Sequence, residues 1–399
     1  MIIGLSKSFY AVKREPSVTT FHWLVPVIFA MVLVGCSGLP SKEPEQAVAA
    51  PASSLPHKPA VKIAPRPKPL TGQALVSSLL PPALADRDGW AADIMAVFEV
   101  LKIPPGKANI CAVLAEIGQE SSFQTDPVVF GLTRIVRDKL EASRTKYAIP
   151  QWVMKRSLAM KSPDGHSYDE RIDALKTEND LYLLYEDMVS EIPLGKKFLA
   201  DFNPVQTVGP MQVSLSFANS YATKKHYPYA YEGPLRNALA TRKGGLYFGV
   251  AYLLDYPASY DSIAFRFADF NAGQYSSRNA AFQNALSSLT GKPLRRDGDL
   301  LRYKDGVALE DVSQTMQALL SISSRLGMGK AEILHNLLLE KSPAFEHSQL
   351  YTRVFALAPP MPRAYLPEIV VGGPKTSGML TTAMYAKKVD GRYRRCLSQ

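Results

Sequence analysis

Hydrophobic residues recur every three to four positions along much of the chain, which is the spacing of amphipathic helices. Strand-like alternation is sparse by comparison, so the pattern predicts a mostly α-helical protein. The best-defined helical pattern begins near Asp88, and Pro104-Pro105-Gly106 ends it. Helices are expected over residues 88–103, 110–120, 128–202, 213–222, 245–256, 262–270 and 276–357.

The second of these helices carries a carboxylate on its hydrophobic face. Glu120 lies three residues after Ile117 and continues the apolar stripe at the end of the helix. Partial burial and the negative end of the helix dipole would both favour its protonated form and raise its pKa, as a general acid requires. The alternative is a surface Glu at a fraying helix end. Glu116, one turn earlier, falls at the margin of the stripe and is expected to be solvated.

The N-terminus indicates export. Basic residues precede an apolar run over residues 23–34, and Leu33-Val34-Gly35-Cys36 resembles the bacterial lipobox. We therefore expect residues 1–35 to be a lipoprotein signal peptide and Cys36 to be lipidated. Ser37 in place of Asp implies sorting to the outer membrane, facing the periplasm. The alternative is an ordinary signal anchor that contains a cysteine.

Composition then divides the rest of the chain. Residues 36–70 are rich in Pro, Ala and Ser without apolar periodicity, as in an extended tether. The folded domain is expected over residues 71–358, followed by an irregular tail at 359–399. Cys111 and Cys396 remain, and in an oxidising compartment they form either a disulfide or two separate thiols.

The net charge of +10 suits a polyanionic partner such as an acidic cell-wall polymer or anionic lipid. The positive charge is scattered, without a basic helix interleaved with aromatics, so nucleic acid is not an expected partner. The sequence offers neither a metal-ligand nor a nucleophile constellation, and no cofactor is expected. Protein partners, oligomeric state and any preference for glycan length or peptide stem are not predicted.

Four short motifs follow one another in the order found in a known enzyme group. They are Gln119-Glu-Ser-Ser-Phe123, Gly209-Pro-Met-Gln212, Gly249-Val-Ala-Tyr-Leu253 and Phe270-Asn-Ala-Gly273. Together they resemble the motifs of lytic transglycosylases in the soluble-transglycosylase and goose-lysozyme-like superfamily. The overall organisation also resembles a family of proteobacterial lipoproteins.

The resemblance implies a lysozyme-like helical lobe that cleaves peptidoglycan glycan strands. It places the catalytic acid/base at Glu120, which would protonate the glycosidic oxygen and then help to close a 1,6-anhydro ring. A single carboxylate then suffices, unlike the pair in most glycosidases. The implied substrate-binding residues are Ser121, Met211, Gln212, Tyr252 and Asn271.

The sequence also departs from the family pattern. Eighty-nine residues separate Glu120 from Gly209, so residues of about 128–202 would be a helical insertion, with additional C-terminal helices following the lobe. Pro210 and Phe270 replace a Leu and a Tyr. Two alternatives therefore stay open: a non-catalytic peptidoglycan-binding lipoprotein, and a hydrolytic muramidase that uses Asp126 or Asp269 as its base.

Overall fold

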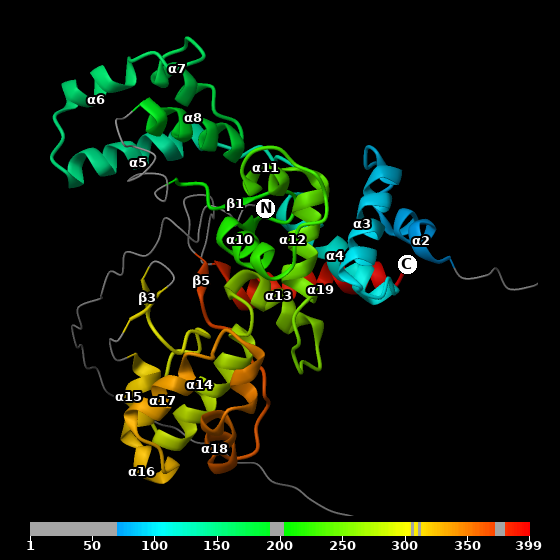
Figure 1. Ribbon diagram of the computed structural model, residues 1–399, viewed down its shortest axis with the longest axis vertical. Helices are drawn as coiled ribbons and strands as arrows, with labels where there is room; N and C mark the ends of the chain where they lie inside the picture. The colour runs from blue at the N-terminus through cyan, green and yellow to red at the C-terminus, as the bar shows by residue number, and fades with distance from the viewer. Residues whose placement is uncertain (1–69, 192–202, 305–306, 310–312, 372–379) are drawn as a thin grey trace, which may run out of the picture. The chain divides into compact units, whose positions relative to one another are not determined.

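The computed structural model describes residues 70–191, 203–304, 307–309, 313–371 and 380–399. These residues are mostly helical, with three two-stranded antiparallel pairs, so the predicted fold class is confirmed at that level (Figure 1). A lysozyme-like arrangement stays a prediction. The signal peptide, most of the tether and Cys36 lie outside the described residues. Three separate hydrophobic clusters organise the described helices.

The first cluster surrounds the helix that ends at Glu120. Its helices are α2 (Gly72–Leu79), α3 (Arg87–Leu101), α4 (Lys107–Glu120), α10 (Leu215–Lys224), α11 (Leu235–Ala240), α12 (Arg242–Leu254), α13 (Ile263–Ala272) and α19 (Thr382–Leu397). Strands β1 (Thr207–Val208) and β2 (Val213–Ser214) pair at its edge, with Val208 opposite Val213. A short pair of β5 (Val370–Val371) and β6 (Leu380–Thr381) precedes α19.

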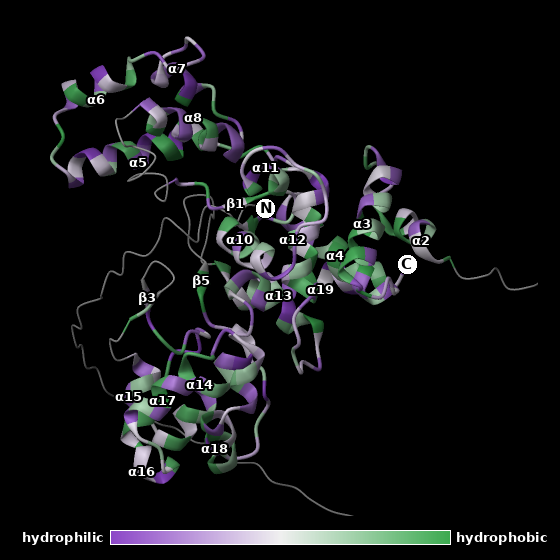
Figure 2. Cartoon of the chain, viewed as in Figure 1, coloured by the Kyte–Doolittle hydropathy of each residue, from purple (hydrophilic) through white to green (hydrophobic). Residues whose placement is uncertain are grey.

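Helix α4 is buried on all sides rather than along one stripe. Every residue from Ile110 to Glu120 is buried, and Figure 2 shows hydrophobic residues along this helix. Ala112, Ala115 and Gly118 are small residues on the faces that the apolar stripe does not use. Small residues allow neighbouring helices to approach closely, and α19 packs directly against α4 (Figure 1).

The expected irregular tail at 359–399 is wrong over its last part, because residues 382–397 form α19. Thr381 caps this helix by accepting a hydrogen bond from the backbone N–H of Met384. The buried positions Thr382, Tyr385, Ala386 and Val389 follow helical spacing. Polar and basic residues fill the remaining faces, so the apolar stripe is narrow and easily missed in the sequence.

The second cluster contains the additional C-terminal helices. They are α14 (Ser276–Thr290), α15 (Gln314–Ser321), α16 (Ser323–Leu326), α17 (Lys330–Leu337), the 3₁₀ helix η2 (Pro343–His347) and α18 (Gln349–Leu357). Strands β3 (Tyr303–Lys304) and β4 (Val307–Ala308) pair antiparallel beside them. Phe282 packs against both Phe345 and Tyr351 at the centre of this cluster.

The third cluster belongs to the segment that the sequence sets apart as an insertion. Its helices are α5 (Leu132–Lys146), α6 (Gln151–Leu158), α7 (Tyr168–Asp173) and α8 (Glu178–Glu191). They bury a small set of side chains of their own, including Val129, Leu132 and Ile172. Helix α7 begins with a capping box between Ser167 and Glu170.

Candidate functional site

Glu120 meets a second carboxylate and a tyrosine at the end of α4. The Tyr385 hydroxyl on α19 donates to Glu120 Oε1 at 2.5 Å, and it also hydrogen-bonds Glu116 Oε1. Glu120 is 3% exposed, while Glu116 and Tyr385 are fully buried. The solvated position expected for Glu116 is therefore wrong, because α19 covers that face of α4 and brings a hydroxyl to it.

Tyr385 stays protonated in this setting. Burial, followed by the charges of Glu116 and Glu120, raises its pKa well above the usual value. Its hydroxyl is therefore a permanent hydrogen-bond donor to the two carboxyl groups at neutral pH. Two carboxyl oxygens that share one donor form a polar cluster inside a hydrophobic core.

A disulfide holds the far end of α19 to the start of α4. Cys111 and Cys396 are bonded, with their Cα atoms 5.5 Å apart, which resolves the alternatives left open by the sequence. Tyr385 and the disulfide thus attach α19 to α4 at two places. The helix that covers Glu120 is held covalently to the helix that carries it.

The same helix reaches the last motif. Thr382, one turn before Tyr385, donates its hydroxyl to Asn271 Oδ1 at 2.8 Å. Asn271 is buried near the end of α13, and Gly273 follows with φ of 120°, a conformation that favours glycine. Glu120 and Asn271 are therefore connected through two side chains on successive positions of one face of α19.

The backbone after Glu120 makes an unusual turn. Ser122 and Phe123 both have positive φ, at 53° and 63°. Such conformations are uncommon for residues other than glycine and tend to occur at functional sites. Ser121 is fully buried, and its hydroxyl hydrogen-bonds the Ile117 carbonyl oxygen, so it shapes the end of α4.

The second motif forms a tight turn seated on α12. Gly209 has φ of 79°, and a Cβ there would lie 2.5 Å from the Leu239 carbonyl oxygen. Cβ atoms at Gly245 and Gly249 would collide with Pro210 and Met211 respectively. The glycines of α12 thus make room for the turn. Met211 is fully buried here, as a core residue would be.

Gln212 lines a small polar pocket. Its side chain accepts from Thr207 Oγ1 and donates to the Gly209 carbonyl oxygen. The pocket has a volume of about 80 Å³ and is also lined by Asp126 and Arg236. Burial raises the pKa of Asp126 and lowers that of Arg236. Neither Glu120 nor Asn271 lines this pocket.

Tyr252 lines a different and larger cleft of about 570 Å³. Its ring packs edge-on between Phe217 and Phe270, and Gln274 donates to its backbone carbonyl. Tyr275 and Lys224 also border the cleft. Aromatic side chains with convergent polar groups are typical of ligand-binding clefts of this size. Ala272 and Gly273, the neighbours of Asn271 in the chain, form part of its wall.

Asp269 is fully buried and braces the start of α14. It accepts hydrogen bonds from the hydroxyls of Tyr256 and Tyr260 and from the backbone N–H groups of Tyr275 and Ser277. Burial raises its pKa to about 6, against the opposing effect of these donors. Its partners are those of a structural carboxylate.

The structure thus brings together some of the predicted site residues. Glu120 and Asn271 join through α19, Tyr252 lies at the cleft beside Asn271, and Gln212 lines the separate pocket. Sequence reasoning missed Tyr385 and Thr382. The helical spacing of buried residues around Tyr385 is the signal that could have found them.

Most of the chain, including the candidate site described above, matches one protein family. The family model described as a protein of unknown function (DUF1615) matches residues 83–399. The chain belongs to the DUF1615 family. A further relative is the uncharacterized protein YaiW of Escherichia coli (strain K12), which is 41% identical over 331 residues. That match covers 82% of this chain and 89% of YaiW. No solved structure matches.

The DUF1615 match includes all four motifs as well as α19 and both disulfide cysteines. Within the described residues of this family member, no group of three or more His, Cys, Asp or Glu side chains could hold a metal ion. Nor is any described helix both long and apolar enough to cross a membrane.

Proposed function

We propose that this protein cleaves peptidoglycan glycan strands as a lytic transglycosylase with Glu120 as its single acid/base. The observation that carries the proposal is the position of the Glu120 carboxyl group. It is buried and accepts a hydrogen bond from the Tyr385 hydroxyl, and Thr382 on the same helix, α19, hydrogen-bonds Asn271. The order of the four motifs and the aromatic cleft beside Asn271 support it. The predicted lipid on Cys36 would hold the enzyme at the envelope, at the outer membrane facing the periplasm.

The reaction needs one proton donor that later becomes an acceptor. Protonated Glu120 donates its proton to the glycosidic oxygen between N-acetylmuramate and N-acetylglucosamine as the bond from C1 to that oxygen breaks. The resulting carboxylate accepts the proton of the muramoyl 6-hydroxyl, whose oxygen bonds to C1 and closes the anhydro ring. Glu120 ends protonated, and no water is consumed. Because Tyr385 covers the carboxyl, its side chain has to move aside for a glycan to reach Glu120.

The test is a digestion of purified sacculi by the full-length protein with its disulfide intact. Mass spectrometry should detect anhydromuropeptides, and Glu120→Gln should lower their yield at least a hundredfold, because general acid–base catalysis contributes about that much. Glu99→Gln, an exposed change on α3, is the matched control and should retain full yield. Equal yields from Glu120→Gln and wild type would contradict the proposal. Products with reducing ends would instead identify a hydrolytic muramidase.

A second candidate is peptidoglycan binding without turnover. The burial of Glu120 and Asn271 beneath α19 favours it, because a closed carboxyl cluster can serve packing alone. Sedimentation with sacculi, unaffected by Glu120→Gln and without product release, would support this function. Absence of both binding and products would exclude both candidates.

A further inference from the structure

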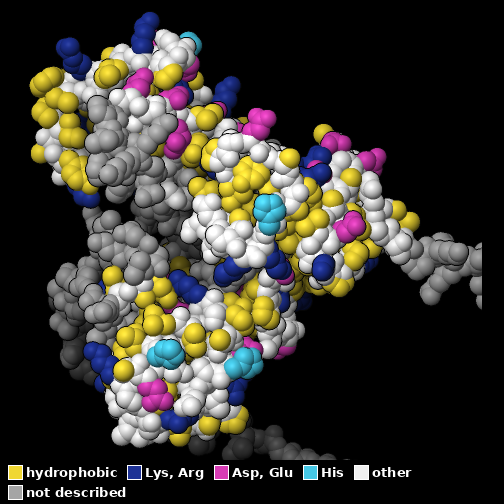
Figure 3. Space-filling view, in the orientation of Figure 1, with side chains coloured by type: hydrophobic (Ala, Val, Ile, Leu, Met, Phe, Trp, Pro, Cys, Tyr) yellow, Lys and Arg dark blue, Asp and Glu magenta, His cyan; other side chains and the backbone are white. Residues whose placement is uncertain are grey.

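Helix α6 lies in the third cluster, yet no residue of this helix is buried. Trp152 is 69% exposed, and the flanking residues Tyr147 and Met160 are exposed by 66% and 55%. Several exposed large apolar side chains within one short segment favour an interaction site over an isolated exposed residue. Figure 3 shows hydrophobic side chains beside dark blue cationic ones over this part of the molecule.

Cations share the exposed face of α6. Lys155 and Arg156 are three and four residues after Trp152, so helical geometry places them beside it. Lys146 and Lys161 are exposed at either end of the segment. None of these four cations forms an ion pair with a residue that the structure describes. We call Lys146, Tyr147, Trp152, Lys155, Arg156 and Met160 the α6 surface.

Charge divides sharply along this segment. Residues 128–161 carry eight Lys and Arg against two Asp and Glu, a net charge of +6. Residues 162–191 carry two Lys and Arg against nine Asp and Glu, a net charge of −7. The α6 surface therefore belongs to the basic half of an otherwise nearly neutral lobe.

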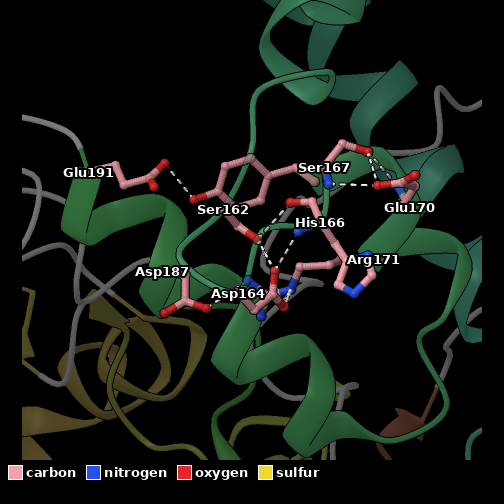
Figure 4. A network of polar contacts seen from close by, with 9 residues as sticks. Ser162, Asp164, His166, Ser167, Glu170, Arg171, Asp187 and Glu191 are labelled. Carbon is pink, nitrogen blue, oxygen red and sulfur yellow. Dashed lines mark hydrogen bonds and ion pairs between the residues drawn. The ribbon is translucent and has the colours of Figure 1, made fainter.

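The acidic half is engaged in contacts of its own. Figure 4 shows Arg171 between Asp164 and Asp187, and an ion pair joins it to each. Glu170 closes the capping box with Ser167, and Glu191 accepts from the Tyr168 hydroxyl (Figure 4). These contacts fix α7 to α8 and to the loop after α6. Several of the carboxylates therefore have partners inside the lobe, whereas the cations of α6 face outward.

From this surface we propose that the protein docks on an anionic phospholipid bilayer through the α6 surface, with Trp152 and Met160 entering the headgroup region. Lys and Arg are attracted to the negative surface potential, while aromatic and sulfur-containing side chains partition into the interface. A glycan partner would not need the exposed thioether side chain of Met160. The charge complementarity to an anionic headgroup layer selects the bilayer, and the inference is independent of any catalytic role.

Trp152 makes the proposal directly measurable. The chain has three tryptophans, Trp23, Trp90 and Trp152, and Trp90 is buried in the first cluster. Full-length protein is anchored in vesicles of phosphatidylcholine, with or without added phosphatidylglycerol. A parallel set of each vesicle type contains lipids with brominated acyl chains, which quench tryptophan emission on contact. The difference in emission between wild type and Trp152→Phe isolates the signal of Trp152.

With phosphatidylglycerol present, Trp152 emission should shift to the blue and brominated lipid should quench it. The double variant Lys155→Gln/Arg156→Gln should lower the ratio of anchored molecules whose α6 surface contacts the bilayer to those whose α6 surface does not. The expected decrease is about fivefold for each charge removed. Lys176→Gln, an exposed change in the same lobe away from α6, is the matched control. Circular dichroism checks that each variant keeps its helices. Unquenched emission, identical in both vesicle types, would overturn the proposal, as would a blue shift produced by sacculi alone.

Discussion

Two buried carboxyl groups other than the proposed acid/base Glu120 have strongly raised pKa values. Asp269 in the first cluster has its pKa raised to about 6, and Glu340 beside the second cluster to about 7. Burial is the first cause in each case. Both groups bind a proton more tightly in the folded protein than in the unfolded chain. Their contribution to stability is fully present below their ordinary pKa values of 3.8 and 4.5 and is lost as pH rises through the folded values.

We therefore expect the urea midpoint to fall between pH 5 and pH 8. Glu340 contributes about 3 kcal/mol across its window, since each pKa unit corresponds to about 1.4 kcal/mol. Glu340→Gln should reduce the slope of this pH dependence to the part that Asp269 contributes, because a neutral amide does not titrate. Glu332→Gln, an exposed change on α17, should leave the slope as in wild type. The same pH dependence in Glu340→Gln and wild type would show that Glu340 does not titrate there.

At the scale of elements, the sequence predicts best those helices that the local spacing of apolar residues indicates. The helices from Trp90 and from Ile110, and the glycine-bearing helix before Tyr256, were all expected from apolar periodicity and turn residues. The contact between Glu120 and Tyr385 joins residues 265 positions apart, and no local pattern encodes such a pairing. The burial of Glu116 and the disulfide depend on that contact between helices, so neither could be settled from the sequence.

The close packing of the Gly209–Gln212 turn against α12 predicts that a larger residue at Gly249 destabilises the protein. A Cβ at Gly249 would lie 2.4 Å from Met211 Sδ, so Gly249→Ala forces the turn away from the helix. Overpacking of this kind costs about 1 to 3 kcal/mol. Gly329→Ala is the control, because its Cβ would meet no atom within 4 Å. Thermal melts followed by circular dichroism compare the two, and equal midpoints would contradict the close packing.

At the scale of the described molecule, the Cys111–Cys396 disulfide closes a loop of chain that contains nearly all the helices after α4. Residues 111 to 396 include the second and third clusters in full. Each cluster has its own hydrophobic core, so the bond does not assemble them. Its effect is concentrated on the first cluster, where both of its cysteines are buried.

Replacing both cysteines by serine should lower stability by about 2 to 5 kcal/mol, the usual cost of losing a disulfide that closes a long loop. The melting temperature of the Cys111→Ser/Cys396→Ser variant should equal that of reduced wild type. Calorimetry with and without reductant tests this, with the variant expected to be insensitive to reductant. A reductant-insensitive wild type would show that the bond adds nothing to stability.

The pairing of α4 with α19 also has a consequence for biosynthesis. The partner of α4 is the last described helix in chain order, so the core around Glu120 stays incomplete until the chain has entered its folding compartment through residue 397. A chain truncated before α19 would leave Glu116, Glu120 and Cys111 uncovered on α4. Quality-control proteases recognise such exposed segments, which would limit the accumulation of incomplete copies.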